Sequence, residues 1–146
     1  YLAGDDTDSH VDTLARFTDR ETIVYVRCQD ENDEHFEALA QMEQELKAFR
    51  DFDDKPFNLI ALPMTDAIYY DGERLPATYA NFLIINGAVI IPTYKDRHDQ
   101  EALGIIEKAF PKREVIGVDC SVLIRQHGSL HCVTMQFPSA VTLKVE

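Results

Sequence analysis

The order of apolar and polar residues predicts two strands, a helix and a third strand in the first part of the chain. Leu14 to Phe17 and Thr22 to Cys28 suit two paired strands, because a short polar turn separates them. Between about Asp33 and Phe52, apolar residues recur at steps of three and four, which predicts an amphipathic helix. The apolar run from Phe57 to Met64 suits a buried strand.

The same order of elements returns further along the chain. Asn81 to Asn86 and Ala88 to Thr93 are expected to form a hairpin, because the Asn-Gly pair between them favours a tight turn. A second helix is expected to begin at Asp96 to Asp99 and to end before Pro111. Glu114 to Val118 is then expected to be the closing strand.

These two groups of elements indicate an internal repeat. Ala15 and Phe17 correspond to Ala80 and Phe82 at an offset of 65 residues, and the closing strands correspond at an offset of about 57. Two ββαβ units in an α/β fold are therefore predicted. The predicted single domain spans residues 1–146, with repeat units at about 10–64 and 79–120 and a final segment at 121–146.

The final segment and the connection between the repeats are less regular. Thr65 to Thr78 is expected to be a long connecting loop. After a loop around Gly128, the stretch from His131 to Phe137 is expected to be a strand. Cys132 would then lie where a loop meets a rigid element, a position that suits a functional side chain.

The net charge of −12 is concentrated in one part of the sequence. Residues 1–54 contain 16 acidic against 5 basic side chains, and the remainder is nearly balanced. An acidic surface repels phosphate, so no nucleic-acid partner is expected. It attracts cations, although a solvated acidic face that serves only solubility explains the same charge. No apolar run is long enough to span a bilayer, so no membrane partner is expected.

The three cysteines are Cys28, Cys120 and Cys132, and none of them forms a CxxC pair. An odd number without that spacing argues against a disulfide framework and against a zinc site, and it favours a reducing, cytoplasmic compartment. Cys28 and Cys120 continue or end apolar strands, so both are interpreted as small buried hydrophobic residues.

Two short motifs could carry chemistry. In an extended backbone His10 and Asp12 would share one face and could act as an acid–base pair, although His-x-Asp also occurs by chance. No third ligand at a suitable spacing supports a metal site there. Cys132 follows His131, and nearby imidazole or backbone donors would favour its thiolate form. A buried, unreactive thiol fits the same position.

Three segments around these residues carry recognisable motifs. The run from Thr7 to Phe17 reads Thr-Asp-Ser-His-Val-Asp-Thr-Leu-Ala-Arg-Phe, Tyr79 to Pro92 contains the Asn-Gly hairpin, and Leu130 to Gln136 contains His-Cys-Val-Thr. In this order they resemble the agmatine deiminase family, a branch of the guanidine-modifying pentein superfamily. Two positions depart from the family pattern: Ser9 stands where many relatives have Gly, and Gln126-His-Gly-Ser129 replaces most of a glycine run.

The resemblance implies a pentein-type α/β propeller built of ββαβ units, of which this chain would form a C-terminal part with about two units and the nucleophile strand. It implies hydrolysis of agmatine to N-carbamoylputrescine and ammonia, a reaction of putrescine and polyamine synthesis, through a covalent thiouronium on Cys132. His10 would be the general acid and base, Asp12 would bind the guanidinium, and Asp8 and Ser129 would lie beside the substrate. No metal or organic cofactor is implied.

Two other functions fit the same sequence. A bacterial peptidylarginine deiminase shares the His-x-Asp and Cys arrangement but acts on protein arginine; the run from Thr7 to Phe17 favours the agmatine branch. The chain also starts at Tyr1 without Met and lacks the upstream half that supplies a further carboxylate in relatives, so it could be a catalytically incomplete fragment. The expected partners are a small cationic guanidine, the N-terminal half of the same protein and, in an oligomer, a second copy.

Overall fold

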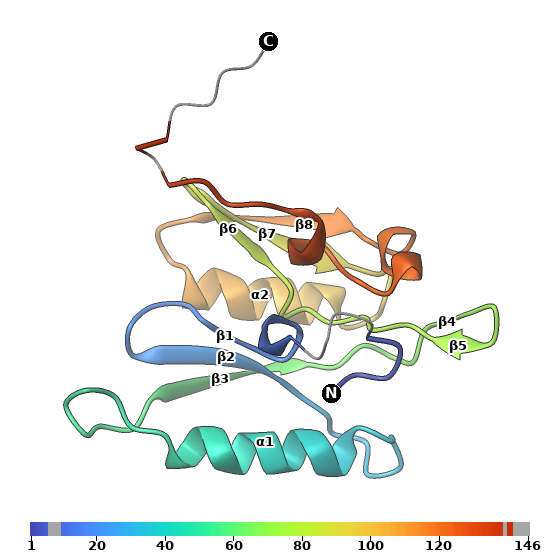
Figure 1. Ribbon diagram of the computed structural model, residues 1–146, viewed down its shortest axis with the longest axis horizontal. Helices are drawn as coiled ribbons and strands as arrows, with labels where there is room; N and C mark the ends of the chain where they lie inside the picture. The colour runs from blue at the N-terminus through green and yellow to red at the C-terminus, as the bar shows by residue number, and fades with distance from the viewer. Residues whose placement is uncertain (6–9, 139, 142–146) are drawn as a thin grey trace.

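The first repeat forms a three-stranded mixed sheet with a helix on one face (Figure 1). β1 (Ala15–Phe17) pairs antiparallel with β2 (Thr22–Arg27), and β2 pairs in parallel with β3 (Asn58–Pro63). A parallel pair requires a crossover connection, and α1 (Phe36–Ala48) supplies it. In this computed structural model the described residues are 1–5, 10–138, 140 and 141.

The second repeat has the same topology. β6 (Leu83–Ile85) pairs antiparallel with β7 (Ala88–Thr93), and β7 pairs in parallel with β8 (Glu114–Asp119) across the crossover helix α2 (Asp99–Ala109). The first residue of β7 lies opposite the first residue of β8, as the first residues of β2 and β3 do. The predicted α/β fold is confirmed; its arrangement as part of a propeller stays a prediction.

The two repeats are stacked so that α2 lies between the two sheets, with α1 outside the first sheet (Figure 1). Alternation along β2 explains the packing, because successive side chains of a strand point to opposite faces. Val24 and Val26 belong to the main core, whereas Ile23 and Tyr25 pack with the residues that α1 covers. The central helix contributes Ile106, which is fully buried and stabilises the core by roughly 1.5–3 kcal/mol.

The first helix starts later than predicted, whereas the second begins within the predicted range. α1 begins at Phe36 rather than near Asp33, because the Asp33 carboxylate accepts a hydrogen bond from the backbone N–H of His35 and holds a turn there. The second repeat repeats this device: Asp96 accepts from the N–H of His98 at 2.8 Å, and α2 follows. The shared Asp-x-His turn is a further mark of the repeat.

The connection between the repeats contains a hairpin that was predicted as loop. β4 (Tyr69–Tyr70) and β5 (Glu73–Arg74) pair antiparallel. The turn residues Asp71 and Gly72 both have positive φ, of 51° and 86°, which is the requirement of the tight turn that joins twisted strands.

The prediction of a strand from His131 to Phe137 is wrong. His131–Val133 is a 3₁₀ helix (η3), and the residues from Thr134 to Phe137 have no regular secondary structure. The hydroxyl of Thr134 donates to the carbonyl of His131 at 2.8 Å and closes the turn, and the Gln136 amide donates to the carbonyl of Ile84. Side-chain hydrogen bonds therefore take the place of a strand ladder.

The predicted final segment is only partly described, because residues 139 and 142–146 lie outside the described part of the chain. Within the described residues, neither helix reaches the length and hydrophobicity that a bilayer crossing requires.

Candidate active site

The His10–Asp12 segment does not have the extended backbone that would place both side chains on one face. His10 has extended backbone angles, but Val11–Thr13 forms a 3₁₀ helix (η1). The hydroxyl of Thr13 donates to the carbonyl of His10 at 2.8 Å and stabilises this turn. With three residues per turn, the side chains of His10 and Asp12 do not project from one face. His10 is exposed and Asp12 is half-buried.

Asp12 lies beside the nucleophile segment, 119 residues away in sequence. Its Oδ2 accepts hydrogen bonds from the Asn81 amide nitrogen at 3.1 Å and from Nδ1 of His131 at 2.7 Å. Within the described part of the chain, no hydrogen bond reaches the second oxygen, Oδ1. A carboxylate oxygen has two lone pairs, so Asp12 keeps acceptor capacity for a further donor.

Asn81 connects the two halves of the site. Its side chain is fully buried and donates to Asp12, while its Oδ1 accepts from the backbone N–H of His131 at 2.8 Å and from the Cys132 thiol at 3.5 Å. Asn81 lies just before β6, so the second repeat holds it rigidly. One amide therefore fixes the relative position of Asp12 and Cys132.

Cys132 is the exposed cysteine of the three, in the second position of η3. Cys28 and Cys120 are buried, as their strand positions indicate, and burial raises the pKa of both thiols, for Cys120 to about 11. Accessibility therefore distinguishes Cys132 from the two other thiols, which burial holds in the protonated form at neutral pH.

Arg16 contributes a positive charge to the same region. Its Nη1 donates to the carbonyl of Phe82 at 2.8 Å, and the guanidinium lies over the Phe82 ring, 4.9 Å from the centroid. Burial lowers the pKa of Arg16, whereas the negative charges of Asp12 and Cys132 raise it. An arginine keeps its charge under such conditions, because its pKa starts above 12.

The other predicted site residues are placed differently. Ser129 is 1% exposed, and its hydroxyl is 2.6 Å from the hydroxyl of Tyr94, so it packs in the core behind η3. Asp8 lies outside the described residues. The ring of His10 has no hydrogen bond to Asp12, His131 or Cys132 in the described part of the structure.

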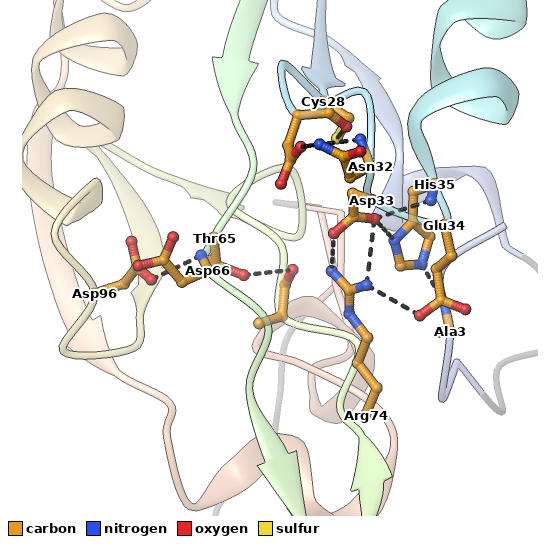
Figure 2. A network of polar contacts seen from close by, with 12 residues as sticks. Ala3, Cys28, Asn32, Asp33, Glu34, His35, Thr65, Asp66, Arg74 and Asp96 are labelled. Carbon is orange, nitrogen blue, oxygen red and sulfur yellow. Dashed lines mark hydrogen bonds and ion pairs between the residues drawn. The ribbon is translucent and has the colours of Figure 1, made fainter.

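A polar network anchors the chain ahead of His10 (Figure 2). The N–H of Ala3 donates to Nε2 of His35 at 2.7 Å, so the ring proton is on Nδ1, which faces Asp33. Arg74 pairs with Asp33 at 2.7 Å and with Glu34 at 3.0 Å. This network connects the N-terminal segment around Ala3 with the turn before α1, and it connects that turn with β5.

A separate hollow lies between the N-terminal ends of the two helices. Its volume is about 530 Å³, and its lining includes Cys28, Asp33 and His98 but none of the predicted catalytic residues. Asp66, Asp96 and His98 place one ligand atom each within 4.8 Å of one another, a spacing that a cation could use. Arg97 already pairs with Asp66, and Asp96 already accepts from His98, so internal hydrogen bonds account for the cluster.

Comparison with known proteins identifies the family. The model of the Porphyromonas-type peptidyl-arginine deiminases matches residues 2–138. This chain belongs to that family. The membership confirms the predicted relationship to agmatine deiminases and peptidylarginine deiminases, and therefore to enzymes that deiminate guanidines.

Solved and curated members of the family are similar over nearly the whole chain. A Porphyromonas gingivalis protein, provisionally named an arginine deiminase, is 61% identical with a TM-score of 0.93, over 95% of this chain and 41% of its own. Campylobacter jejuni agmatine deiminase is 47% identical with a TM-score of 0.81, over 90% and 38%. Agmatine deiminase of Pseudomonas putida is 29% identical over 96% and 43%. The chain spans about two fifths of the length of these relatives.

Sequence reasoning had singled out His10, Asp12 and Cys132, and the structure brings Asp12 and Cys132 together through Asn81. The sequence analysis predicted no role for Asn81 or Arg16. Both lie inside the segments that carry the family resemblance, and a polar or charged residue among the apolar residues of such a segment could have marked them as site candidates. The ring of His131, which precedes Cys132 in the sequence, binds Asp12 in the structure.

Proposed function

We propose that the protein hydrolyses the guanidinium group of agmatine, giving N-carbamoylputrescine and ammonia, with Cys132 as the nucleophile. One observation carries the proposal: the side-chain amide of Asn81 donates to the Asp12 carboxylate and accepts from the Cys132 thiol, so both groups lie next to the same side chain. A guanidinium needs an anion to fix its plane and a nucleophile within reach of its central carbon. Asp12 and Cys132 meet these two requirements.

The proposed reaction uses these groups together with His10. Oδ1 of Asp12 would accept N–H donors of the guanidinium, while Oδ2 stays bound to Asn81 and His131. The Cys132 thiolate attacks the central carbon, His10 protonates the departing nitrogen, and ammonia leaves a thiouronium adduct on sulfur. Neutral His10 then activates water, which releases the ureido product. Asp8 is retained as a proposed substrate neighbour, whereas the buried Ser129, whose hydroxyl bonds to that of Tyr94, is not.

Agmatine is preferred over protein arginine because the run from Thr7 to Phe17 resembles the agmatine branch and because the Campylobacter jejuni and Pseudomonas putida relatives are named agmatine deiminases. Peptidylarginine deimination is the second candidate, because the family model and a solved structure that is 57% identical to this chain bear that name. The third is a catalytically incomplete chain, because the relatives are more than twice as long. We also propose a cytoplasmic location and assembly with the N-terminal half of the same protein or with a second copy.

The test measures ammonia release and the mass of the protein together. Purified protein is incubated with agmatine and, separately, with an arginine-containing peptide. Ammonia from agmatine and a transient adduct on the Cys132 peptide, both abolished in Cys132→Ala, are the expected results. Cys132 is exposed, so the substitution should leave the unfolding free energy within about 0.5 kcal/mol of the wild-type value.

The other outcomes separate the three candidates. Turnover of the peptide without turnover of agmatine would assign the protein to the second candidate. A single species near 16.7 kDa that releases no ammonia from either substrate would support the incomplete chain. Retained activity in Cys132→Ala would remove Cys132 from the nucleophile role.

A further inference from the structure

The proposed site requires two negative charges close together. The Asp12 carboxylate accepts a hydrogen bond from Nδ2 of Asn81 at 3.1 Å, and the Cys132 thiol donates to Oδ1 of the same side chain at 3.5 Å. Two neighbouring anions disfavour each other's ionised form, so a carboxylate beside the nucleophile works against the reactive thiolate. Before a cationic substrate arrives, something in the protein must offset this repulsion.

Arg16 lies where it can do so. It follows η1 in the chain and belongs to β1, and its guanidinium is fixed on the carbonyl of Phe82 at 2.8 Å. Phe82 is the residue after Asn81, so the cation is anchored on the residue next to the one whose side-chain amide contacts Asp12 and Cys132. Stacking over the Phe82 ring fixes it from a second side.

We propose, on the basis of the proposed function, that Arg16 is a fixed counter-ion that allows the Asp12 carboxylate and the Cys132 thiolate to be ionised together in the free protein. Arg16 is thus a positioning residue that acts through the electrostatic field. It touches neither the substrate nor the reacting atoms.

The anchoring on Phe82 matters for this role. Within the described residues Arg16 forms no ion pair with Asp12, and its Nη1 donates to the Phe82 carbonyl instead. A mobile cation would occupy Oδ1 of Asp12 and compete with the guanidinium of the substrate. A cation held a short distance away compensates the charge and leaves that oxygen accessible.

The electrostatic surroundings support this arrangement. The charges of Asp12 and Cys132 are the two that raise the pKa of Arg16, against burial, which lowers it. Among the described residues, His131 binds Asp12, and the buried Tyr94 lies within electrostatic reach of Cys132: burial and the charge of Cys132 both raise the pKa of Tyr94. A neutral tyrosine cannot offset the two anions, whereas a guanidinium keeps its positive charge at neutral pH.

The experiment follows the alkylation of Cys132 by iodoacetamide across pH 5 to 9, read by peptide mass, because only the thiolate reacts. Arg16→Gln can still donate to the Phe82 carbonyl but is neutral, and Arg16→Lys keeps the charge. Arg20→Gln, at an exposed position in the turn after β1, is the matched control.

In Arg16→Gln the rate-against-pH curve should move by about one unit to higher pH, which lowers the rate at pH 6 about tenfold. Arg16→Lys should recover most of the wild-type rate, and Arg20→Gln should equal the wild type. An Arg16→Gln curve that coincides with the wild-type curve overturns the proposal.

Unfolding and loss of function are distinguishable from these outcomes. If Arg16→Gln unfolds, the buried Cys28 and Cys120 become alkylated as well, and Arg16→Met, which retains the apolar contact with Phe82, is then compared in its place. The measurement uses no substrate. If the Arg16→Gln alkylation curve is shifted as expected but the wild type gives no ammonia and no adduct with agmatine, the proposed function fails while the role of Arg16 stands.

Discussion

Oδ2 of Asp12 and Nδ1 of His131 lie 2.7 Å apart, although 119 residues separate them. Asp12 belongs to the turn before the first sheet, and His131 belongs to the turn after the second. Asn81, which precedes the second sheet, binds both turns. Stacking of the two repeats is therefore what assembles the site, and residues that bridge the repeats should matter most.

Asn81 should be sensitive to replacement even by similar residues. Asn81→Ala removes the donor to Asp12 and the acceptor for His131 and Cys132, so we expect about 1–3 kcal/mol lower unfolding free energy and at least about a hundredfold loss of turnover. Asn86→Ala, at the exposed hairpin turn, is the control and should change neither. Urea unfolding and ammonia release give the two values; near-normal turnover in Asn81→Ala would show that the bridge is dispensable.

His10 and His131 should give different defects. His10→Ala removes both the acid that protonates the departing nitrogen and the base that activates water, so the thiouronium should form slowly, and any adduct that forms should persist and be seen by intact mass. His131→Ala removes a hydrogen bond to Asp12 and should raise KM without trapping the adduct. If His10→Ala turns over agmatine normally, the acid–base role belongs to another group, and trapping in His131→Ala instead would point to His131.

Asp33 should make stability depend on pH under acidic conditions (Figure 2). Burial raises the pKa of Asp33, but hydrogen bonds from Arg74 and His35 outweigh it and hold the pKa at about 2, below the usual 3.8. Because the folded value is the lower one, the stabilisation is complete above about pH 4 and is lost as pH falls through about 2. Its size should be about 1–2 kcal/mol, since the carboxylate is partly screened by solvent.

The measurement is the difference in unfolding free energy between wild type and Asp33→Asn. This difference should be larger at pH 5 than at pH 2. Asp53→Asn, which alters the highly exposed pair with Lys55, should show a small and nearly constant difference. An Asp33→Asn difference that is the same at both pH values would contradict the assignment.

Gly4 should not tolerate a side chain. It has φ +78°, and a Cβ there would lie 2.0 Å from the carbonyl oxygen of Arg74, so Gly4→Ala should displace residues 1–5. Gly72 has a similar φ of +86° with open space around it, so Gly72→Ala measures the cost of the backbone angle alone. We expect Gly4→Ala to lower the unfolding free energy by about 1–3 kcal/mol more than Gly72→Ala does. Equal losses would show that the N-terminal segment moves aside freely.

Local patterns were sufficient wherever an element depends on its own residues. The strands β2, β3, β7 and β8 lie within one residue of their predicted ends, because apolar runs bounded by turns indicate strands even where, as in β8, most residues are exposed. The predicted N-terminal end of α1 and the strand predicted at Cys132 were wrong, because the hydrogen bonds of Asp33 and of Thr134 decide the backbone there. Side-chain to backbone bonds of this kind leave no periodic trace in a sequence.

The sequence by itself determined the class of fold, the internal repeat and, through the motifs around His10 and Cys132, the family. Only the tertiary structure decided that one buried amide, Asn81, joins Asp12 to the nucleophile turn, and that Arg16 stands beside them. The reason is physical: periodicity reports which face of an element is buried, whereas a site depends on contacts between distant elements. Those contacts are fixed by how the two sheets pack on α2.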